Sequence, residues 1–273
     1  ELGQTFATGT HAFDQAIALT PVAPNLYKGS TSDAFKNMVG PFGGLTAAIL
    51  LNAVLQHPER LGDPVSLTVN FAGPVGDGDF EVEATPLRTN RSTQHWLLLQ
   101  KQNGEVVTSA TAFFANRRET LSEQQLAAPQ APAPTSLQRV DLSIRNWFKQ
   151  YDFRFVRGVP FSRRPEDEPE TESLLWVRDY PERALDFASL TALGDVFAPR
   201  VFLLRQSFTP SGTVSMTHYF HATGEELLQA SGFLLGQARA TRLHRNYADQ
   251  IAHLWSEDGV LLLTSTQSVY FKE

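Results

Sequence analysis

The sequence has 273 residues and contains no cysteine. Disulfides, thiolate nucleophiles and zinc sites built on cysteine are therefore excluded. No apolar run approaches the ~20 residues that a helix needs to cross a bilayer, and the N-terminus lacks the basic and then apolar order of a signal peptide. We expect a cytoplasmic protein with no membrane span.

Positive charge is also scarce in this chain. The formal net charge is −6, the pI is about 5.7, and Lys and Arg form no stripe along the sequence. A nucleic-acid surface needs such a stripe, so we expect no nucleic-acid partner, although a local basic patch could hold a phosphorylated ligand. With 42% hydrophobic and 19% charged residues, the chain has enough apolar material for a globular core.

Several motifs of enzyme chemistry are missing as well. The sequence has no G-x-S-x-G elbow, no G-x-x-x-x-G-K-[ST] loop and no G-x-G-x-x-G after a strand, so a serine α/β-hydrolase, a kinase and a dinucleotide enzyme are not indicated. None of the seven histidines forms H-x-x-x-H or H-E-x-x-H, and the side chains of His218 and His221 face opposite ways on a predicted strand. We expect no metal site and no redox cofactor.

What the sequence does contain is a faint internal repeat. Residues 65–71 read VSLTVNF and residues 214–220 read VSMTHYF, at an offset of 149 residues. A second match joins Asn103-Gly104 with Asp258-Gly259, each a tight turn followed by a β-rich run. Solenoid repeats have periods of roughly 20–50 residues, so one repeat of this length indicates a duplicated domain.

Each copy combines alternating segments with one helix. In the first half we expect strands at 13–20, 64–72, 79–84, 95–101 and 106–116, and a buried helix over the apolar run 43–55. In the second half we expect a strand at 174–178 and a helix at 183–198, then segments 213–221 and 227–240 and a closing hairpin of 251–255 with 260–270. This order predicts an α+β unit, used twice, in which an antiparallel sheet wraps around a central helix.

The two units are separated by a stretch without periodicity. Residues 119–134 are rich in Gln, Ala and Pro, a composition typical of a linker. We therefore expect an N-terminal unit at 1–118, a linker at 119–150 and a C-terminal unit at 151–273. The charged, proline-broken segment 163–170 is typical of a solvated loop.

Three polar residues distinguish the second copy from the first. Thr213 corresponds to Pro64 and Gln267 corresponds to Ala112, while Asp195 lies near the C-terminal end of the second predicted helix. A carboxylate can accept a proton from water, and a Thr hydroxyl and a Gln amide can hold that water in place. A partly desolvated pocket would raise the pKa of the Asp toward the working pH.

At these residues the sequence resembles the acyl-CoA thioesterase II family, whose members are double hotdogs. The matching motifs are Phe42-Gly43-Gly44 before the first helix, Asp195 near the end of the second helix, the run from Thr213 to His221, and the hairpin from Asp258 to Gln267. The resemblance covers most of the chain, and its specificity is concentrated in these few residues.

The resemblance implies a fold, a reaction and a site. The fold is two antiparallel sheets, each wrapped around a central helix. The reaction is hydrolysis of an acyl-CoA to a free acid and coenzyme A by water that Asp195, Thr213 and Gln267 activate, with no cofactor. Gly43 and Gly44 would offer backbone N–H groups to an anion or a carbonyl oxygen. Acyl-CoA is the expected partner, and a homo-oligomer is the expected assembly.

Some alternatives stay open at this point. Asp186 competes with Asp195 as the base, because the spacing from Asp195 to Thr213 is shorter than in the best-known members of the family. The tryptophan-rich motif that often follows the Thr is absent. Each of these residues, and the turn at Gly43-Gly44, also has an ordinary structural explanation. The alternative function is a non-catalytic acyl-CoA-binding protein, and a hydratase would need an Asp-His pairing that the sequence does not show.

Overall fold

The computed structural model of the protein describes residues 11–141, 145–230 and 232–273. The strands are β1 (Thr20–Ala23), β2 (Leu26–Ser30), β3 (Asp63–Phe71), β4 (Asp79–Thr89), β5 (Thr93–Gln102), β6 (Glu105–Ala115), β7 (Tyr151–Arg157), β8 (Ser173–Asp179), β9 (Ser211–Phe220), β10 (Leu234–Arg239), β11 (Leu243–His244), β12 (Tyr247–Trp255) and β13 (Leu261–Phe271). The α-helices are α2 (Ala12–Ala16), α3 (Gly43–Leu55), α4 (Phe187–Leu193), α5 (Val201–Arg205) and α6 (Gly224–Gln229). Short 3-10 turns lie at Asp33–Phe35, Pro134–Ser136 and Asn146–Gln150.

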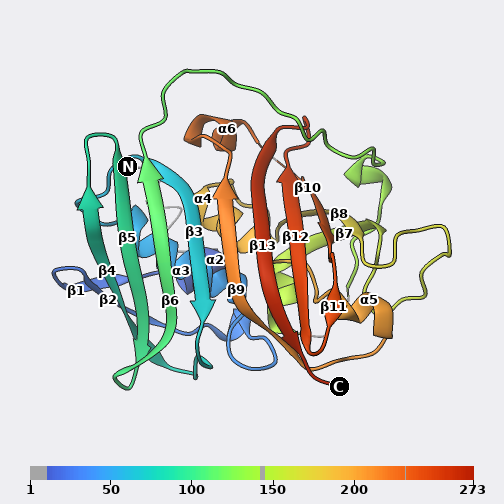
Figure 1. Cartoon of the computed structure of the whole chain (residues 1–273), viewed down its shortest axis with the longest axis horizontal. Coiled ribbons are helices and arrows are strands. Elements are labelled where there is room, and N and C mark those ends of the chain that lie inside the picture. Colours follow the sequence, from blue (N-terminus) through green and yellow to red (C-terminus); the bar gives the residue numbers. More distant parts are fainter. Residues whose placement is uncertain (1–10, 142–144, 231) are drawn as a thin grey trace.

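All of these strands belong to one antiparallel sheet. Its order is β1-β2-β4-β5-β6-β3-β9-β13-β12-β10-β8-β7, and β11 pairs with β12 at one side (Figure 1). The two separate sheets expected from the repeat are therefore one continuous sheet. The reason is that β3 of the first half pairs with β9 of the second, so neither half keeps a free edge there.

The seam between the two halves falls at the centre of the repeat. Thr68 lies directly opposite Thr217, and their hydroxyl oxygens are 3.0 Å apart. These two residues are equivalent positions of the two copies, 149 residues apart. An antiparallel pair brings equivalent residues face to face only at its midpoint, so an approximate two-fold axis passes through this pair.

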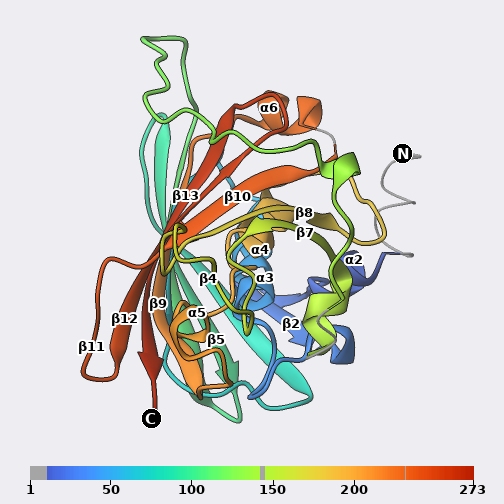
Figure 2. The ribbon, with the colours of Figure 1, turned by 90° about the vertical axis from the view of Figure 1, so that its right-hand side faces the viewer.

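The helices α3 and α4 lie side by side against one face of the sheet, which Figure 2 shows edge-on. The predicted helix 43–55 matches α3 at both ends, and ten of the thirteen residues of α3 are buried. Gly44 is needed for the contact of the two helices, because a Cβ at this position would lie 2.7 Å from the carbonyl oxygen of Ala192. Both helices thus sit between the curved sheet and the segments that cross over it.

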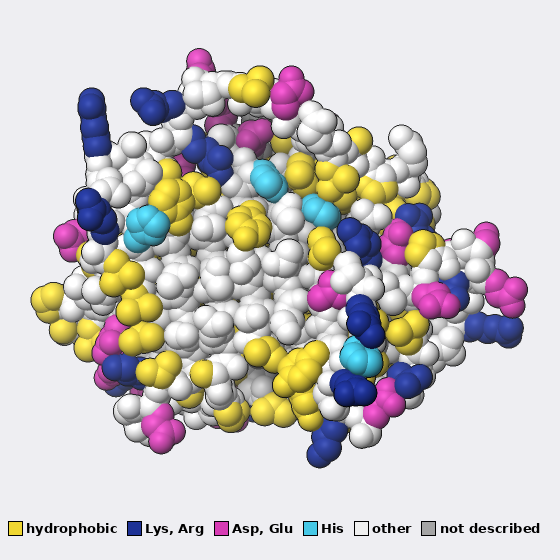
Figure 3. All heavy atoms as spheres, in the orientation of Figure 1, with side chains coloured by type: hydrophobic (Ala, Val, Ile, Leu, Met, Phe, Trp, Pro, Cys, Tyr) yellow, Lys and Arg dark blue, Asp and Glu magenta, His cyan; other side chains and the backbone are white. Residues whose placement is uncertain are grey.

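The opposite face of the sheet carries few charges. Figure 3 shows this face, on which the charged side chains gather toward the margins and leave the centre largely clear. The central strands present Ser and Thr there, among them Ser66 and Thr68 on β3, Thr111 on β6, Thr217 on β9 and Thr266 on β13.

Several predicted boundaries differ from the observed ones. The first half of the strand expected at 13–20 lies in the helix α2, where the buried side chains of Phe13 and Ala16 are three residues apart on one helix face. The helix expected at 183–198 is only α4, and the segment 227–240 divides into the end of α6 and the strand β10. The other predicted strands lie where the sequence pattern places them, some of them extended by several residues. The strands β1, β2, β7 and β11 were not predicted.

The expected linker region crosses from one half to the other. No strand or α-helix occurs between β6 and β7 among the described residues of that region, and the chain passes over the molecule as a long connection (Figure 1). Its end is not loose, because the ring of Trp147 stacks on that of Phe42 with 4.3 Å between centroids. The region therefore contributes a side chain to the packing around the start of α3.

Candidate active site

The structure brings together Thr213 on β9, Gln267 on β13 and Asp195, which lies in the turn directly after α4 and not within the helix. The hydroxyl of Thr213 on β9 donates a hydrogen bond to Oε1 of Gln267 at 3.0 Å. The amide nitrogen Nε2 of Gln267 on β13 donates to Oδ1 of Asp195 at 2.5 Å. Residues up to 72 positions apart thus form one hydrogen-bonded row from hydroxyl to carboxylate.

A β-bulge turns Thr213 toward the other two residues. The buried side chain of Met216 faces the core of the molecule. Thr213 precedes it by three residues, so in a regular strand the side chain of Thr213 would point to the opposite face of the sheet. The pairing with β13 shifts by one residue between Ser215 and Thr213, and the extra residue, Val214, is exposed. Bulges of this kind re-aim a side chain, and here Thr213 comes to share the face of Gln267.

The first copy of the repeat has the same irregularity without the chemistry. In β3 the pairing with β6 shifts between Pro64 and Ser66, so Val65 occupies the place of Val214. Pro64 stands where the second copy has Thr213, and it has no hydroxyl to donate. The hydrogen-bonded row therefore has no counterpart in the first half.

The N-terminus of α3 faces the carboxylate of Asp195. A Cβ on Gly43 would lie 3.0 Å from Oδ2 of Asp195, so a side chain at this position would crowd the carboxylate. The backbone N–H of Gly44 also interacts with this carboxylate. Because the first N–H groups of a helix carry partial positive charge, they stabilise the ionised form of Asp195.

The pKa of Asp195 lies far above the usual value of an aspartate. Removal of the carboxylate from water raises its pKa to about 7, and the hydrogen bond from Gln267 and the backbone amide of Gly44 offset only part of this effect. The side chain keeps some exposure to solvent. At neutral pH the carboxylate is therefore present in both protonation states and can accept or release a proton.

Asp186, the competing candidate for the base, is the N-cap residue of α4. Its carboxylate accepts a hydrogen bond from the backbone N–H of Ser189 at 2.9 Å, and the Ser189 hydroxyl accepts from the N–H of Asp186, which completes a capping box. Arg183 also donates to it at 2.9 Å. Burial alone would raise its pKa, but the bonds from Arg183 and Ser189 outweigh burial and hold the pKa below the usual value.

His218 holds the end of α4 on the sheet, a role that the sequence did not reveal. Its Nε2–H donates to the carbonyl oxygen of Thr191 at 2.8 Å, and its Nδ1 accepts from the hydroxyl of Ser265 at 2.9 Å. We assign this tautomer because a carbonyl oxygen can only accept. Burial lowers the pKa of His218 to about 4, so the ring is neutral. The only signal in the sequence was that His218 shares an inward face with Met216 and Phe220.

Two features are absent from the part of the chain that the structure describes. Within the described ranges, no helix has the length and apolar character that a membrane span requires. Nor do three or more His, Asp or Glu side chains of that part of the chain come together as a metal site would require. Apolar side chains border the hydrogen-bonded row: Phe71 lies against Gly43, and the sulfur of Met216 lies 3.5 Å from Nε2 of Gln267.

Comparison with protein families decides the class of the protein. Residues 32–115 match the acyl-CoA thioesterase N-terminal domain, and residues 123–271 match the acyl-CoA thioesterase C-terminal domain. This chain belongs to the acyl-CoA thioesterase family. The thioesterase is accordingly a thioester hydrolase, and both of its halves are family domains.

Solved structures share the fold of the thioesterase. A hot dog fold protein of unknown function from Alicyclobacillus acidocaldarius is 46% identical to it with a TM-score of 0.92, over 97% of this chain and 99% of that one. A thioesterase II described as putative, from Thermobifida fusca, is 20% identical with a TM-score of 0.81, over 96% and 97% of the two chains. The acyl-CoA thioesterase II TesB2 of Mycobacterium marinum is 18% identical with a TM-score of 0.76, over 95% and 98%. No curated protein matches the thioesterase.

Proposed function

We propose that this thioesterase hydrolyses an acyl-CoA to a free acid and coenzyme A at the row formed by Asp195, Gln267 and Thr213. One observation carries the proposal: a carboxylate whose pKa is about 7 is held by a buried amide, which is itself held by a hydroxyl. A general base works best when its pKa is close to the working pH, and this carboxylate meets that condition.

In the proposed reaction, a water molecule attacks the carbonyl carbon of the thioester while Asp195 accepts one of its protons. Negative charge develops on the carbonyl oxygen. Because the N–H of Gly44 is bound to Asp195, we assign the stabilisation of this oxygen to the N–H of Gly43 at the start of α3. The tetrahedral intermediate then collapses and the C–S bond breaks. The proton held by Asp195 passes to the departing thiolate, so the free acid and the thiol leave and the carboxylate is restored.

Gln267 and Thr213 act in this proposal as positioning residues. The amide of Gln267 is oriented unambiguously by its two bonds, since its nitrogen donates to Asp195 and its oxygen accepts from Thr213. A fixed amide holds the carboxylate in one rotamer and leaves the second carboxylate oxygen, Oδ2, toward Gly43. We place the attacking water beside this second oxygen.

The contacts of the two candidate carboxylates favour Asp195 as the base. Asp186 is ionised, bound to Arg183 and committed to the cap of α4, so proton transfer to it would weaken both contacts. Asp195 forms no ion pair with any residue that the structure describes, and its pKa suits proton transfer near neutral pH.

The proposal is tested by thiol release from short, medium and long acyl-CoAs, with the unaltered protein beside Asp195→Asn, Gln267→Ala and Thr213→Val. We expect Asp195→Asn and Gln267→Ala to lower kcat by about 100-fold or more, and Thr213→Val by about 10-fold, with folding intact. Asp186→Asn is the matched control, for which we expect reduced thermal stability and nearly unchanged kcat per folded molecule.

Two results would contradict the proposal. If Asp195→Asn keeps full activity, the base lies elsewhere. If the unaltered protein binds acyl-CoA saturably but releases no thiol from any of them, the protein is a binding module for acyl-CoA.

We also propose that the molecule assembles with copies of itself. The support is the face shown in Figure 3, whose centre carries Ser and Thr and few charges, so that another copy could pack on it at a small desolvation cost. Sedimentation velocity at several protein concentrations measures the assembly, and a monomer at every concentration would contradict it.

A further inference from the structure

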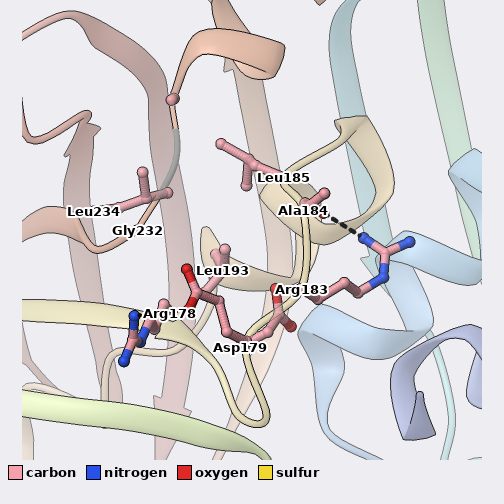
Figure 4. A pocket seen from close by; sticks show the side chains of 10 residues that line it. Arg178, Asp179, Arg183, Ala184, Leu185, Leu193, Gly232 and Leu234 are labelled. Carbon is pink, nitrogen blue, oxygen red and sulfur yellow. Dashed lines mark hydrogen bonds and ion pairs between the residues drawn. The ribbon is translucent and has the colours of Figure 1, made fainter. Parts of the chain in front are cut away.

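A cavity of about 370 Å³ lies beside α4, apart from the candidate active site. Its lining includes the leucines Leu185, Leu193 and Leu234 and the charged residues Arg178, Asp179, Glu182 and Arg183. Figure 4 shows the leucines along one side and Arg178, Asp179 and Arg183 along the other. Asp195, Thr213 and Gln267 are not among its lining residues, although Leu193 lies two residues before Asp195 in the sequence.

The arginines at this cavity are already occupied by carboxylates. Arg183 forms ion pairs with Asp14 at 2.8 Å and with Asp186 at 2.9 Å, and in Figure 4 its guanidinium extends away from the leucines. Arg178 is paired with Glu182 at 3.2 Å and lies 3.8 Å from Asp152. Neither arginine is therefore available to bind an anionic ligand without giving up a partner.

Asp179 differs from every other acid around the cavity. Its side chain is 3% exposed, and among the described residues it forms no ion pair and no hydrogen bond with another residue. Burial raises the pKa of Asp179 to about 7, and the nearby charge of Arg183 offsets only part of this effect. A buried carboxylate without a partner is costly, and a bound cation would remove that cost.

The charges around Asp179 also favour a cation. Ion pairs and close charges connect eight side chains around Asp179 into one group. Its members are the five acids Asp14, Asp152, Asp179, Glu182 and Asp186 and the three arginines Arg154, Arg178 and Arg183. With Asp179 ionised the group has an excess of two negative charges, so an anion is disfavoured and one cationic group is accommodated.

A second buried polar residue is paired with Asp179 in the sheet. Tyr151 is directly opposite Asp179 in the pairing of β7 with β8, and its side chain is 1% exposed. The hydroxyl oxygen of Tyr151 has no hydrogen-bond partner among the described residues. Opposite residues of an antiparallel pair project to the same face, so this oxygen is an additional acceptor on the side of the sheet where Asp179 lies.

We propose that this cavity is a binding site for a primary alkylammonium, with the ammonium group on the carboxylate of Asp179 and the alkyl chain against Leu185, Leu193 and Leu234. The ammonium supplies the missing cationic partner and three N–H donors. The leucines bury the methylenes, which supplies the hydrophobic part of the affinity. The site requires both parts of the ligand, because a polar cation alone gains nothing from the leucines.

The test is isothermal titration calorimetry at pH 8 with two probes of the same length, hexylamine and 1-hexanol. Hexylamine carries the ammonium and 1-hexanol does not. We expect hexylamine to bind at least about tenfold more tightly than 1-hexanol, and we expect Asp179→Asn to abolish this preference. Equal affinities for the two probes, or a preference that persists in Asp179→Asn, would overturn the proposal.

A second variant keeps the test decisive if Asp179→Asn does not fold. Ala184 lines the cavity and is exposed, so Ala184→Phe adds bulk at the mouth without changing the core. We expect Ala184→Phe to weaken both probes by at least about fivefold while circular dichroism stays unchanged. Undiminished binding in Ala184→Phe, or no heat from hexylamine at about 10 mM with the unaltered protein, would also overturn the proposal.

Discussion

The ionised carboxylate of Asp195 destabilises the folded state. The folded protein raises the pKa of this carboxyl to about 7, whereas an aspartate in an unfolded chain titrates near 3.9. Between these two values the folded state binds the proton more tightly, so the stability due to this group falls as the pH rises from about 4 to about 7. Above pH 7 the full destabilisation is present, and this is the condition in which the proposed base works.

A neutral side chain at this position should therefore stabilise the protein at high pH. We expect Asp195→Asn to raise Tm by a few degrees at pH 8 and by much less at pH 5. Differential scanning calorimetry of the two proteins at both values measures this, and the comparison removes contributions from Asp179, which both proteins share. An Asp195→Asn protein that is less stable at pH 8 would show that the carboxylate holds the fold together.

The residues of the candidate site differ in how far the sequence predicts them. Thr213 and Gln267 stand out because the repeat has Pro64 and Ala112 in their places. His218 could not be found in this way, because its partners, Thr191 and Ser265, are distant in sequence and are met only in the folded chain. The choice between Asp186 and Asp195 likewise depended on seeing which of them caps α4.

At the scale of elements, the position of α4 decides where Asp195 lies. The helix has only seven residues, too few to be stable by itself, and it is held by the Asp186 cap at its start and by His218 near its end. A buried histidine that makes two hydrogen bonds leaves two unsatisfied polar groups when it is removed.

We expect His218→Ala to lower the free energy of unfolding by about 2–4 kcal/mol and to lower kcat more than it raises KM, because the carboxylate loses its fixed position. His244→Gln is the control, since His244 is exposed. Urea unfolding and steady-state kinetics measure the two effects. If His218→Ala keeps an unchanged kcat in its folded fraction, His218 has no part in positioning Asp195.

The contact of α3 with α4 rests on a small residue. A Cβ at Gly44 would lie 2.5 Å from the ring of Phe42 and 2.7 Å from the carbonyl oxygen of Ala192, so the helices would have to move apart. We expect Gly44→Ala to lower the free energy of unfolding by about 1–3 kcal/mol. Gly73→Ala, where no atom lies within 4 Å of the added Cβ, should leave it nearly unchanged. Equal effects of the two substitutions in urea unfolding would contradict the close contact.

The strand pattern predicts β3, β5 and β6 well, because each alternates apolar and polar residues along a half-buried face. It finds β8 as a short apolar run, which is buried on both faces. It does not predict which strands meet at the seam. The pairing of β3 with β9 joins residues 149 positions apart and has no local signal. The helix α2 was mistaken for a strand because five residues are too few to separate the two periods.

At the scale of the whole molecule, the seam makes the two halves one cooperative unit. Five pairs of residues join β3 to β9, and α3 of one half packs on α4 of the other. We expect thermal unfolding to be a single transition, with the calorimetric enthalpy close to the van't Hoff enthalpy. Two resolved transitions in a calorimetric scan would show that the halves unfold independently.

The same arrangement explains why one site is built from both halves. The second half supplies Asp195, Thr213 and Gln267, and the first half supplies the start of α3 against which the carboxylate lies. The first half thus contributes a helix N-terminus to the candidate site, while its own strands β3 and β6 carry Pro64 and Ala112 in the places of Thr213 and Gln267.

The most direct test of Asp195 as the base is the pH dependence of kcat/KM for one acyl-CoA, measured by thiol release from about pH 5 to 9. The base acts in its deprotonated form, so we predict that kcat/KM rises with pH through an apparent pKa of about 7 and then levels off. We predict that the residual activity of Asp195→Asn lacks this rise. An unchanged rise near pH 7 in Asp195→Asn would contradict the account, because another group would then be accepting the proton.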